Sequence, residues 1–253
     1  MSDAAGNAPR EFAPGLVVRG FAPPLKLADF RLIAFDMDST LIAIECVDEI
    51  ADVAGKKAEV AAITEAAMRG EIADYKESLR QRVALLKGVP AAALQRVYDE
   101  RVRFNPGAER LVAACQAAGL KTLLVSGGFT FFSDRVRDRL GLDFTRSNVL
   151  EIECGTRNGR DSEGGVLTGR LVDQPWGDIC DGAEKRKMLL ETCTAIGIDA
   201  KQAIAVGDGA NDLPMMAAAG FSIAFHAKPV VRERAMLSIV EGGLDRALSV
   251  LLP

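Results

Sequence analysis

A short apolar run that ends abruptly in two aspartates places the strongest constraint on the fold of this chain. The run 32–35 has the pattern of a buried strand, and Asp36 and Asp38 follow it with one residue between them. Side chains two apart on an extended chain point to the same side, so the two carboxylates can share a pocket. Two acids there repel each other unless a cation or a shared proton holds them. A solvated Asp-x-Asp turn is the ordinary alternative.

Strand-like and helix-like segments alternate through most of the chain, which is typical of a parallel sheet with crossover helices. The strand-like runs are 31–35, 121–125, 203–206 and 221–225, and the helical patterns are 108–118, 131–140 and 183–195. Ligands of such sheets bind beyond the carboxyl ends of the strands. We therefore expect an α/β fold with a Rossmann-like, doubly wound, mostly parallel sheet, whose catalytic core comprises residues 31–43 and 105–253.

Residues 44–104 contain helical patterns and no strand. These patterns lie at 47–54, 58–69, 75–87 and 90–102. Gly55, Gly70 and Gly88 stand where helices commonly end, and Asp74 followed by Glu77 resembles a capping box. A compact group of short helices after the first core strand predicts a small helical-bundle cap domain inserted into the core.

The remaining segments lie at the N-terminus and at one edge of the sheet. Residues 1–30 form an extension, of which 1–14 are rich in Ala, Gly and Pro and are expected to be poorly ordered. Residues 16–18 have the pattern of a short strand. Residues 148–172 predict an edge hairpin with a loose, Gly-rich tip.

Composition excludes several classes of protein. A net charge of −4 gives no reason to expect nucleic acid or an anionic membrane as a partner. The five cysteines are scattered, which favours reduced thiols in a cytosol over disulfides or a zinc site. No apolar stretch approaches the roughly 20 residues that span a bilayer, and no signal-peptide pattern is evident. We expect a soluble cytoplasmic protein, either a monomer or a homodimer.

Two further strand ends carry groups suited to phosphate and metal ions. Ser126 and Gly127 follow the run 121–125, where backbone N–H groups can approach an anion, although Ser-Gly-Gly is also an ordinary turn. Asp208 and Asp212 follow the run 203–206 in a sequence that superficially resembles a dinucleotide-binding turn. Carboxylates there would repel a pyrophosphate, whereas with Mg²⁺ they become ligands.

Several charged residues allow both an ordinary and a functional interpretation. Arg82 lies in the apolar arc of the helix 75–87, where it either snorkels at the edge or meets an anion, such as a carboxylate, in a cleft. Glu45, at the junction of core and cap, either complements a helix dipole or faces the same cleft. Lys185 has charged neighbours and the pattern of a surface lysine. His226, the only histidine, is expected to be structural, and Cys46 to be a packing residue.

In their order along the chain, the motifs 36–40, 126–128, Lys185 and 207–212 resemble the haloacid dehalogenase superfamily. Within it, the stretches 36–49, 78–83 and 125–129 are similar to the phosphoserine phosphatase family. The resemblance covers residues 31 to 253. The chain departs from many bacterial relatives because it is too short before Arg31 for their additional N-terminal domain, and its hairpin near 157–165 is longer.

The resemblance implies a Mg²⁺-dependent phosphomonoester hydrolase that converts O-phospho-L-serine to serine through an aspartyl-phosphate. Asp36 would be the nucleophile and Asp38 the general acid and base. Mg²⁺ would be held by Asp36, the main-chain carbonyl of Asp38 and Asp208, with support from Asp212.

The same resemblance implies the groups that hold the substrate. Ser126, Gly127, Lys185 and Asn211 would bind or orient the phosphate, Arg82 the substrate carboxylate and Glu45 the ammonium. A related phosphatase or phosphotransferase acting on another small phosphate remains an alternative. So does a nonenzymatic module that binds Mg²⁺ or a nucleotide, although such a binder has no need of a proton donor at Asp38.

Overall fold

The computed structural model describes residues 8–69, 71–72, 74–154, 156–157, 160–161 and 164–252. Its centre is a sheet with the strand order β1-β2-β12-β11-β10-β4-β5-β6-β9. The mutually parallel strands are β4 (Leu32–Phe35), β5 (Lys121–Phe129), β6 (Phe144–Glu153), β10 (Ala203–Gly207), β11 (Phe221–Phe225) and β12 (Leu237–Ile239). The chain runs outward from β4 first to β5 and β6, and then on the other side to β10, β11 and β12. This order confirms the doubly wound α/β fold.

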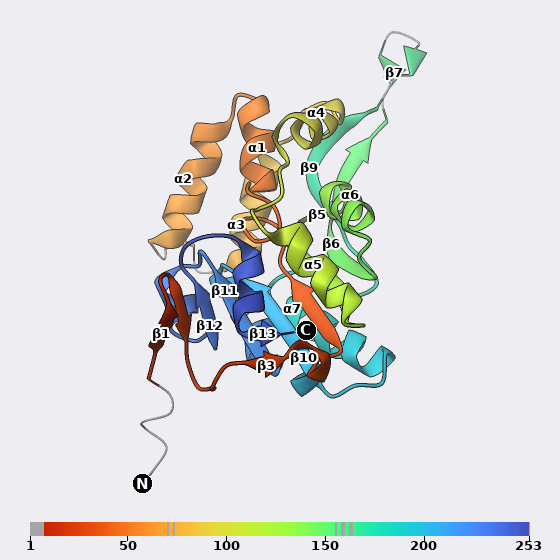
Figure 1. Ribbon diagram of the computed structural model, residues 1–253. Coiled ribbons are helices and arrows are strands. Elements are labelled where there is room, and N and C mark those ends of the chain that lie inside the picture. Colours follow the sequence, from red (N-terminus) through yellow and green to blue (C-terminus); the bar gives the residue numbers. More distant parts are fainter. Residues whose placement is uncertain are drawn as a thin grey trace.

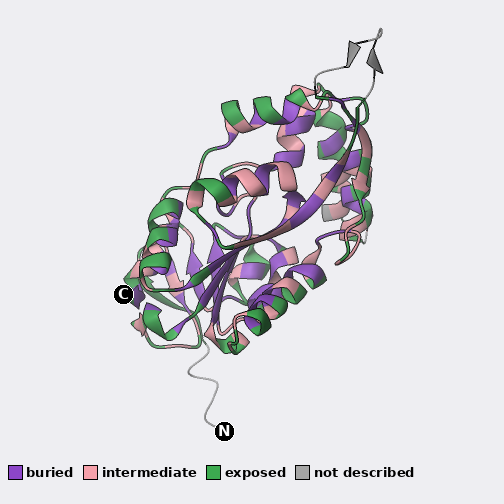
Figure 2. Ribbon diagram, turned by 90° about the vertical axis from the view of Figure 1, so that its right-hand side faces the viewer, coloured by how far each residue is buried: buried purple, intermediate pink, exposed green. Residues whose placement is uncertain are grey.

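Helices cover both faces of the sheet because its central strands are apolar on both sides. In β4, Ile33 and Phe35 belong to one core cluster and Leu32 and Ala34 to the other, and all four are fully buried. The covering helices are α5 (Ala108–Ala117), α6 (Thr130–Leu140), α7 (Gly182–Ala195) and α8 (Leu213–Ala218). α5 and α6 contribute to the first cluster, and α7 and α8 to the second. Figure 2 shows the buried strands between helices with exposed outer turns.

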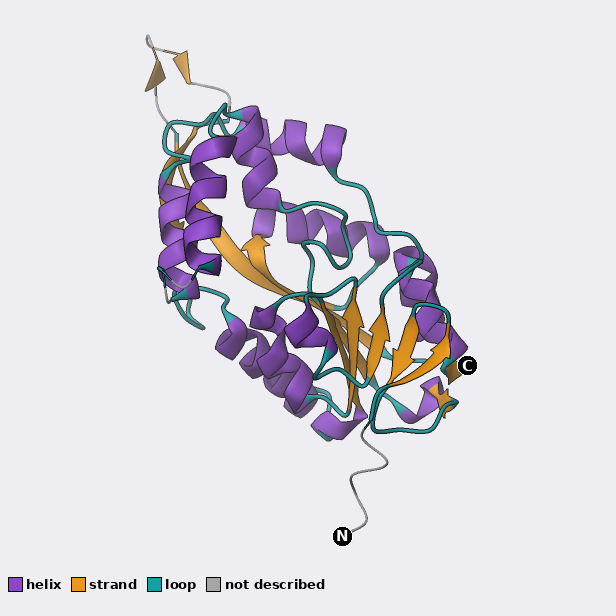
Figure 3. Cartoon of the chain, turned by 90° about the vertical axis from the view of Figure 1, so that its left-hand side faces the viewer, coloured by secondary structure: helices purple, strands orange, loops and turns teal. Residues whose placement is uncertain are grey.

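A second group of helices lies beyond the carboxyl ends of the parallel strands (Figure 1). It consists of α1 (Cys46–Val53), α2 (Lys57–Met68), α3 (Tyr75–Ala84) and α4 (Ala92–Arg101). In Figure 3 the arrowheads of the parallel strands point towards this group. Asp74 caps α3 by accepting the N–H of Lys76, whereas Glu77 accepts a hydrogen bond from Gln81, so the two do not form the predicted capping box. Gly70, predicted to end a helix, lies outside the described residues.

The predicted edge hairpin is formed by β6 and the antiparallel strand β9 (Val166–Val172). Its base is hydrogen-bonded to the connection between α3 and α4: Gly88 N–H donates to Leu167 O and Leu167 N–H to Val89 O, both at 2.8 Å. The hairpin therefore supports the helical group from the side. The tip, predicted to be loose, lies largely outside the described residues, which between Cys154 and Gly164 include only β7 (Thr156–Arg157) and β8 (Arg160–Asp161).

The N-terminal segment extends the sheet beyond β12. The predicted strand 16–18 is present as β2 (Leu16–Val18), which pairs antiparallel with β12. The expected poor order up to residue 14 is wrong for β1 (Arg10–Ala13), which pairs with β2, while residues 1–7 lie outside the described part. Two short strands, β3 (Leu25–Lys26) and β13 (Leu251–Leu252), pair separately. Among the described helices none is long and apolar enough to cross a bilayer.

Candidate active site

A cavity of about 690 Å³ lies between the carboxyl ends of the sheet and the helices α1 to α3. Most of the residues proposed from sequence line it: Asp36, Asp38, Glu45, Arg82, Ser126, Gly127, Asp208 and Asn211. The other two, Lys185 and Asp212, are fully buried beside Asp36. The fold thus brings together every proposed site residue. Tyr75, Asp181 and Lys228 also line the cavity, although no sequence pattern marked them as site residues.

Three carboxylates converge at the ends of β4 and β10. One oxygen from each of Asp36, Asp208 and Asp212 lies within 4.8 Å of the others. Burial, and after it the negative charge of Asp212, raises the pKa of Asp36 well above its usual range. The same two effects, in the same order, raise the pKa of Asp208 to about 7. Converging acids of this kind are stabilised by a cation, and their hard oxygen donors suit Mg²⁺.

Lys185, in the first turn of α7, supplies one positive charge to this cluster. Its Nζ donates to Asp36 Oδ1 at 2.6 Å and to Asp212 Oδ1 at 2.7 Å, and the side chain is fully buried. Burial alone lowers the pKa of Lys185, but the charges of Asp212 and Asp36 outweigh that effect and hold it above the usual value. The interpretation as a surface lysine is therefore wrong. Asp181 caps α7 by accepting the N–H of Glu184.

Asp212 has little capacity left for another ligand. Its Oδ2 accepts the backbone N–H groups of Asp208 at 3.1 Å and Gly209 at 3.0 Å, while Oδ1 accepts from Lys185. These bonds close the turn after β10 and hold the backbone of Asp208 and Gly209 in place. Asp208 itself accepts a hydrogen bond from Thr40 Oγ1 at 3.2 Å.

Asp38 is held against the start of α1. Its Oδ2 accepts the Cys46 N–H at 3.2 Å and its Oδ1 accepts the Cys46 thiol at 3.0 Å. Burial, followed by the nearby charge of Glu45, raises the pKa of Asp38 to about 7. A carboxyl with such a pKa can both donate and accept a proton near neutral pH. Cys46, expected to be a packing residue, is thus also a hydrogen-bond partner of the candidate acid.

The Ser126-Gly127-Gly128 segment is part of β5 and does not form the turn that is its ordinary alternative. A Cβ atom at Gly127 would lie 2.0 Å from the Tyr75 hydroxyl, so any other residue there would require the Tyr75 side chain to move. Asn148, buried on β6, donates to Gly127 O at 2.7 Å and accepts the Cys180 N–H at 2.8 Å. Asn148 therefore ties this segment to the loop before α7, a role that no sequence pattern indicated.

Glu45 and Arg82 face the cavity from the helical group. Glu45 Oε1 accepts the Ser39 hydroxyl at 2.6 Å, and its side chain makes no cap hydrogen bond to α1. Arg82 Nε donates to Ser78 O at 3.4 Å. Both are placed where a small molecule in the cavity can meet one group of each sign.

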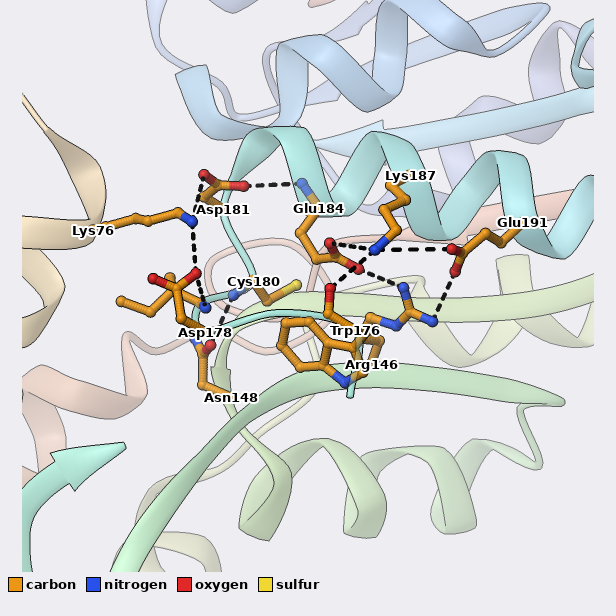
Figure 4. Close-up of polar contacts among 11 residues, drawn as sticks. Lys76, Arg146, Asn148, Trp176, Asp178, Cys180, Asp181, Glu184, Lys187 and Glu191 are labelled. Atoms are coloured by element: carbon orange, nitrogen blue, oxygen red, sulfur yellow. Dashed lines mark hydrogen bonds and ion pairs between the residues drawn. The ribbon is translucent and has the colours of Figure 1, made fainter. Parts of the chain in front are cut away.

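Ion pairs join α3 to the loop before α7. Lys76 Nζ lies 2.7 Å from Asp178 Oδ1 and 3.7 Å from Asp181 Oδ2, and Arg80 lies 2.5 Å from Asp178 Oδ2. Figure 4 shows Lys76 reaching across to both aspartates, with Cys180 and Asn148 beside them. The helical group is therefore attached to the core directly beside the cavity.

Comparison with known proteins gives matches over almost the whole length of the chain. The family model for haloacid dehalogenase-like hydrolases matches residues 33–217. A phosphoserine phosphatase from Albidiferax ferrireducens is 71% identical over 245 residues, which cover 97% of this chain and 99% of that protein. Another, from Polaromonas sp., is 71% identical over 242 residues, which cover 96% and 98%.

Solved structures agree with these matches. A phospho-aspartyl intermediate analogue of phosphoserine phosphatase aligns with a TM-score of 0.77 at 35% identity, covering 88% of this chain and 99% of that chain. A substrate-bound phosphoserine phosphatase complex aligns with the same TM-score and identity, covering 88% and 98%. With the family model and the full-length relatives, these matches establish that the chain belongs to the haloacid dehalogenase-like hydrolases, within the group of the phosphoserine phosphatases.

Proposed function

We propose that this enzyme hydrolyses O-phospho-L-serine to L-serine and phosphate through an aspartyl-phosphate. The observation that carries the proposal is the buried Asp36–Lys185–Asp212 arrangement with Asp38 beside it, at the floor of a cavity. It occurs in a chain that is 71% identical, over almost its full length, to phosphoserine phosphatases.

In the first step a carboxylate oxygen of Asp36 attacks phosphorus in line, and the bond from phosphorus to the serine oxygen breaks. Lys185 fixes the orientation of this carboxylate through Oδ1. Asp38 gives its proton to the departing serine oxygen. Its pKa of about 7 keeps a substantial protonated fraction available near neutral pH.

In the second step Asp38, now ionised, takes a proton from a water molecule that attacks the phosphorus of the aspartyl-phosphate. The bond from phosphorus to the Asp36 oxygen breaks, which releases phosphate and regenerates both aspartates. One residue thus acts as acid and then as base, a role worth about 10²–10⁴-fold in rate.

We propose that the carboxylate cluster holds Mg²⁺. Asp36, Asp208 and the main-chain carbonyl of Asp38 would be its ligands, with Asp212 in support because its own oxygens are already bonded. When bound, the ion would offset negative charge on the phosphoryl oxygens. Burial, followed by the mutual repulsion of these carboxylates, raises the pKa of Asp36 and Asp208, and a divalent cation would relieve that repulsion.

The phosphate would be held by the Ser126 hydroxyl, the Gly127 N–H and Lys185, with Asn211 orienting the neighbouring groups. Residues 44–104 would form the cap, in which Arg82 takes the substrate carboxylate and Glu45 the ammonium. Closure of this cap over the cavity would exclude competing water until serine has left. All of these groups come from a single chain, so the proposed chemistry needs no second copy.

The test is phosphate release from a panel of phosphomonoesters with Mg²⁺, using Asp36→Asn as the blank. A strong preference for O-phospho-L-serine that disappears in the blank supports the proposal. Even turnover across the panel leaves the core chemistry and refutes the roles of Glu45 and Arg82. Absence of turnover with every ester, with Mg²⁺ binding retained, favours a nonenzymatic binding module.

A further inference from the structure

The cavity wall formed by α1 contains a carboxylate that the mechanism above does not use. Asp48 lies in the first turn of α1 and lines the cavity. Its Oδ1 is buried and has no hydrogen-bond partner among the described residues. Because a buried oxygen without a donor is costly, we expect a donor to reach Asp48 at some stage of the reaction.

Arg82 lines the same cavity and has N–H groups to spare. Within the described part of the chain its only hydrogen bond is the long one from Nε to Ser78 O, at 3.4 Å. A guanidinium carries five N–H donors. Among the charges that act on Asp48, that of Arg82 is the strongest and opposes the rise in pKa that burial causes. The two side chains thus attract each other, although the described structure contains no ion pair between them.

The other acids of α1 and its start are already engaged. Glu45 accepts the Ser39 hydroxyl, and Glu49 and Asp52 both pair with Arg101. Asp48 is therefore the α1 acid that remains available to a donor in the cavity.

We propose that Asp48 is a positioning residue for Arg82. It holds one side of the guanidinium so that the other side meets the substrate carboxylate. The inference rests on the proposed function, in which Arg82 binds the carboxylate of O-phospho-L-serine. The guanidinium fork has enough donors for two carboxylates, and Asp48 repels a substrate carboxylate placed anywhere else on this wall. Specificity would then come from attraction at Arg82 combined with repulsion beside it.

The experiment measures kcat and KM for Asp48→Asn with three esters. O-phospho-L-serine carries a carboxylate and an ammonium, 3-phosphooxypropionate only the carboxylate, and O-phosphoethanolamine only the ammonium. We expect kcat/KM for the two carboxylate esters to fall about ten-fold, mainly through KM, since a hydrogen bond to a charged group is lost. The value for O-phosphoethanolamine should not change. In an Arg82→Ala background the substitution should have no further effect.

Asp52→Asn, on the same helix but paired with Arg101, is the matched control and should leave all three values unchanged. An equal loss with all three esters would assign Asp48 a purely structural role and overturn the proposal. A loss confined to the two ammonium esters would make Asp48 an ammonium ligand and also overturn it, as would the absence of any loss. The wild-type arm tests the proposed function separately, because an enzyme without preference for O-phospho-L-serine refutes that function whatever the variants do.

Discussion

The buried lysine at the centre of the site keeps two aspartates together that would otherwise repel each other. Lys185 is fully buried and bonds to both Asp36 and Asp212. Its sequence neighbours are charged, so local pattern alone predicts a surface position, and only the resemblance to a family selected it. Lys185 is buried because the ends of particular strands lie opposite α7. This arrangement belongs to the tertiary structure and cannot be read from the local sequence. The aspartates themselves were predictable because they follow apolar strands, Asp36 directly after β4 and Asp212 five residues beyond the end of β10.

Replacing Lys185 by Met should be severe. It leaves Asp36 and Asp212 without their counter-charge, and breaking a buried pair in this way costs about 3–5 kcal/mol. Urea unfolding and kcat with O-phospho-L-serine measure the loss of stability and of activity. Lys187→Met is the matched control, because the Lys187 side chain is 47% exposed, and its effect should stay within about 0.5 kcal/mol. Equal behaviour of the two variants would contradict the role assigned to Lys185.

The raised pKa values predict an unusual pH dependence for the metal-free protein. Asp38 and Asp208 have pKa values of about 7 in the folded state, above the roughly 3.9 of an unfolded aspartate. The folded state therefore binds protons at these two groups more tightly, so their contribution to stability is largest below about pH 4 and is lost as the pH rises to about 7.

With a chelator present, the thermal midpoint should be lower at pH 8 than at pH 5.5. Asp208→Asn should shrink this difference, and Mg²⁺ should restore stability at pH 8. Asp138→Asn, at a site where the side chain is 68% exposed, is the control and should leave the difference intact. A midpoint that rises from pH 5.5 to pH 8 in the wild type would refute the prediction.

At the scale of elements, ion pairs and backbone hydrogen bonds are among the contacts that join the helical group to the core. Ion pairs connect α3 to the loop before α7, and backbone hydrogen bonds connect the α3–α4 link to the hairpin of β6 and β9. Helix bounds were predictable to within a few residues, since glycines mark their ends. The length of β5 was not predictable from the sequence. The glycines at 127 and 128 are typical of a turn, but in the structure the strand continues through them because Phe129 pairs with Asn148 on β6.

The ion pairs at α3 should contribute to substrate binding. Lys76→Met removes the contacts with Asp178 and Asp181, which are partly exposed, so we expect KM for O-phospho-L-serine to rise about two- to five-fold. Asp178→Asn should add little in the double variant, because the two residues act together. Arg96→Met, which breaks a pair within α4, should leave KM unchanged. Fully additive effects of the Lys76 and Asp178 substitutions would contradict this coupling.

At the scale of the whole molecule, the N-terminal extension is part of the catalytic core's sheet. β2 pairs with β12, and the Phe21 ring contacts Phe221 of β11 edge-on at a centroid distance of 5.0 Å. β1 could not be predicted from the composition of residues 1–14. Its four residues are exposed or half-exposed, so they do not show the alternation of apolar and polar residues that marks a half-buried strand. Its order depends on pairing with β2, and pairing partners cannot be read from local sequence.

Phe21→Ala should destabilise the protein without affecting catalysis. Phe21 is half-buried, so we expect a loss of about 2 kcal/mol, below the 3–5 kcal/mol typical of fully buried aromatic rings. Chemical unfolding measures this loss, while kcat should stay constant because Phe21 does not line the cavity. Phe12→Ala, at a position that is 43% exposed, is the control and should have little effect. A change in kcat with unchanged stability would contradict this expectation.

The pairing of β2 with β12 also affects how the folded protein behaves in concentrated solution. Residues 237–239 of β12 are buried, and without β2 their backbone would form an open, apolar sheet edge. Open edges of this kind recruit strands from other molecules. In the intact chain the outer strand is instead β1, which is short and carries the exposed Arg10 and Glu11. A version trimmed to the core from residue 31 would therefore be prone to aggregation, even with every catalytic residue in place.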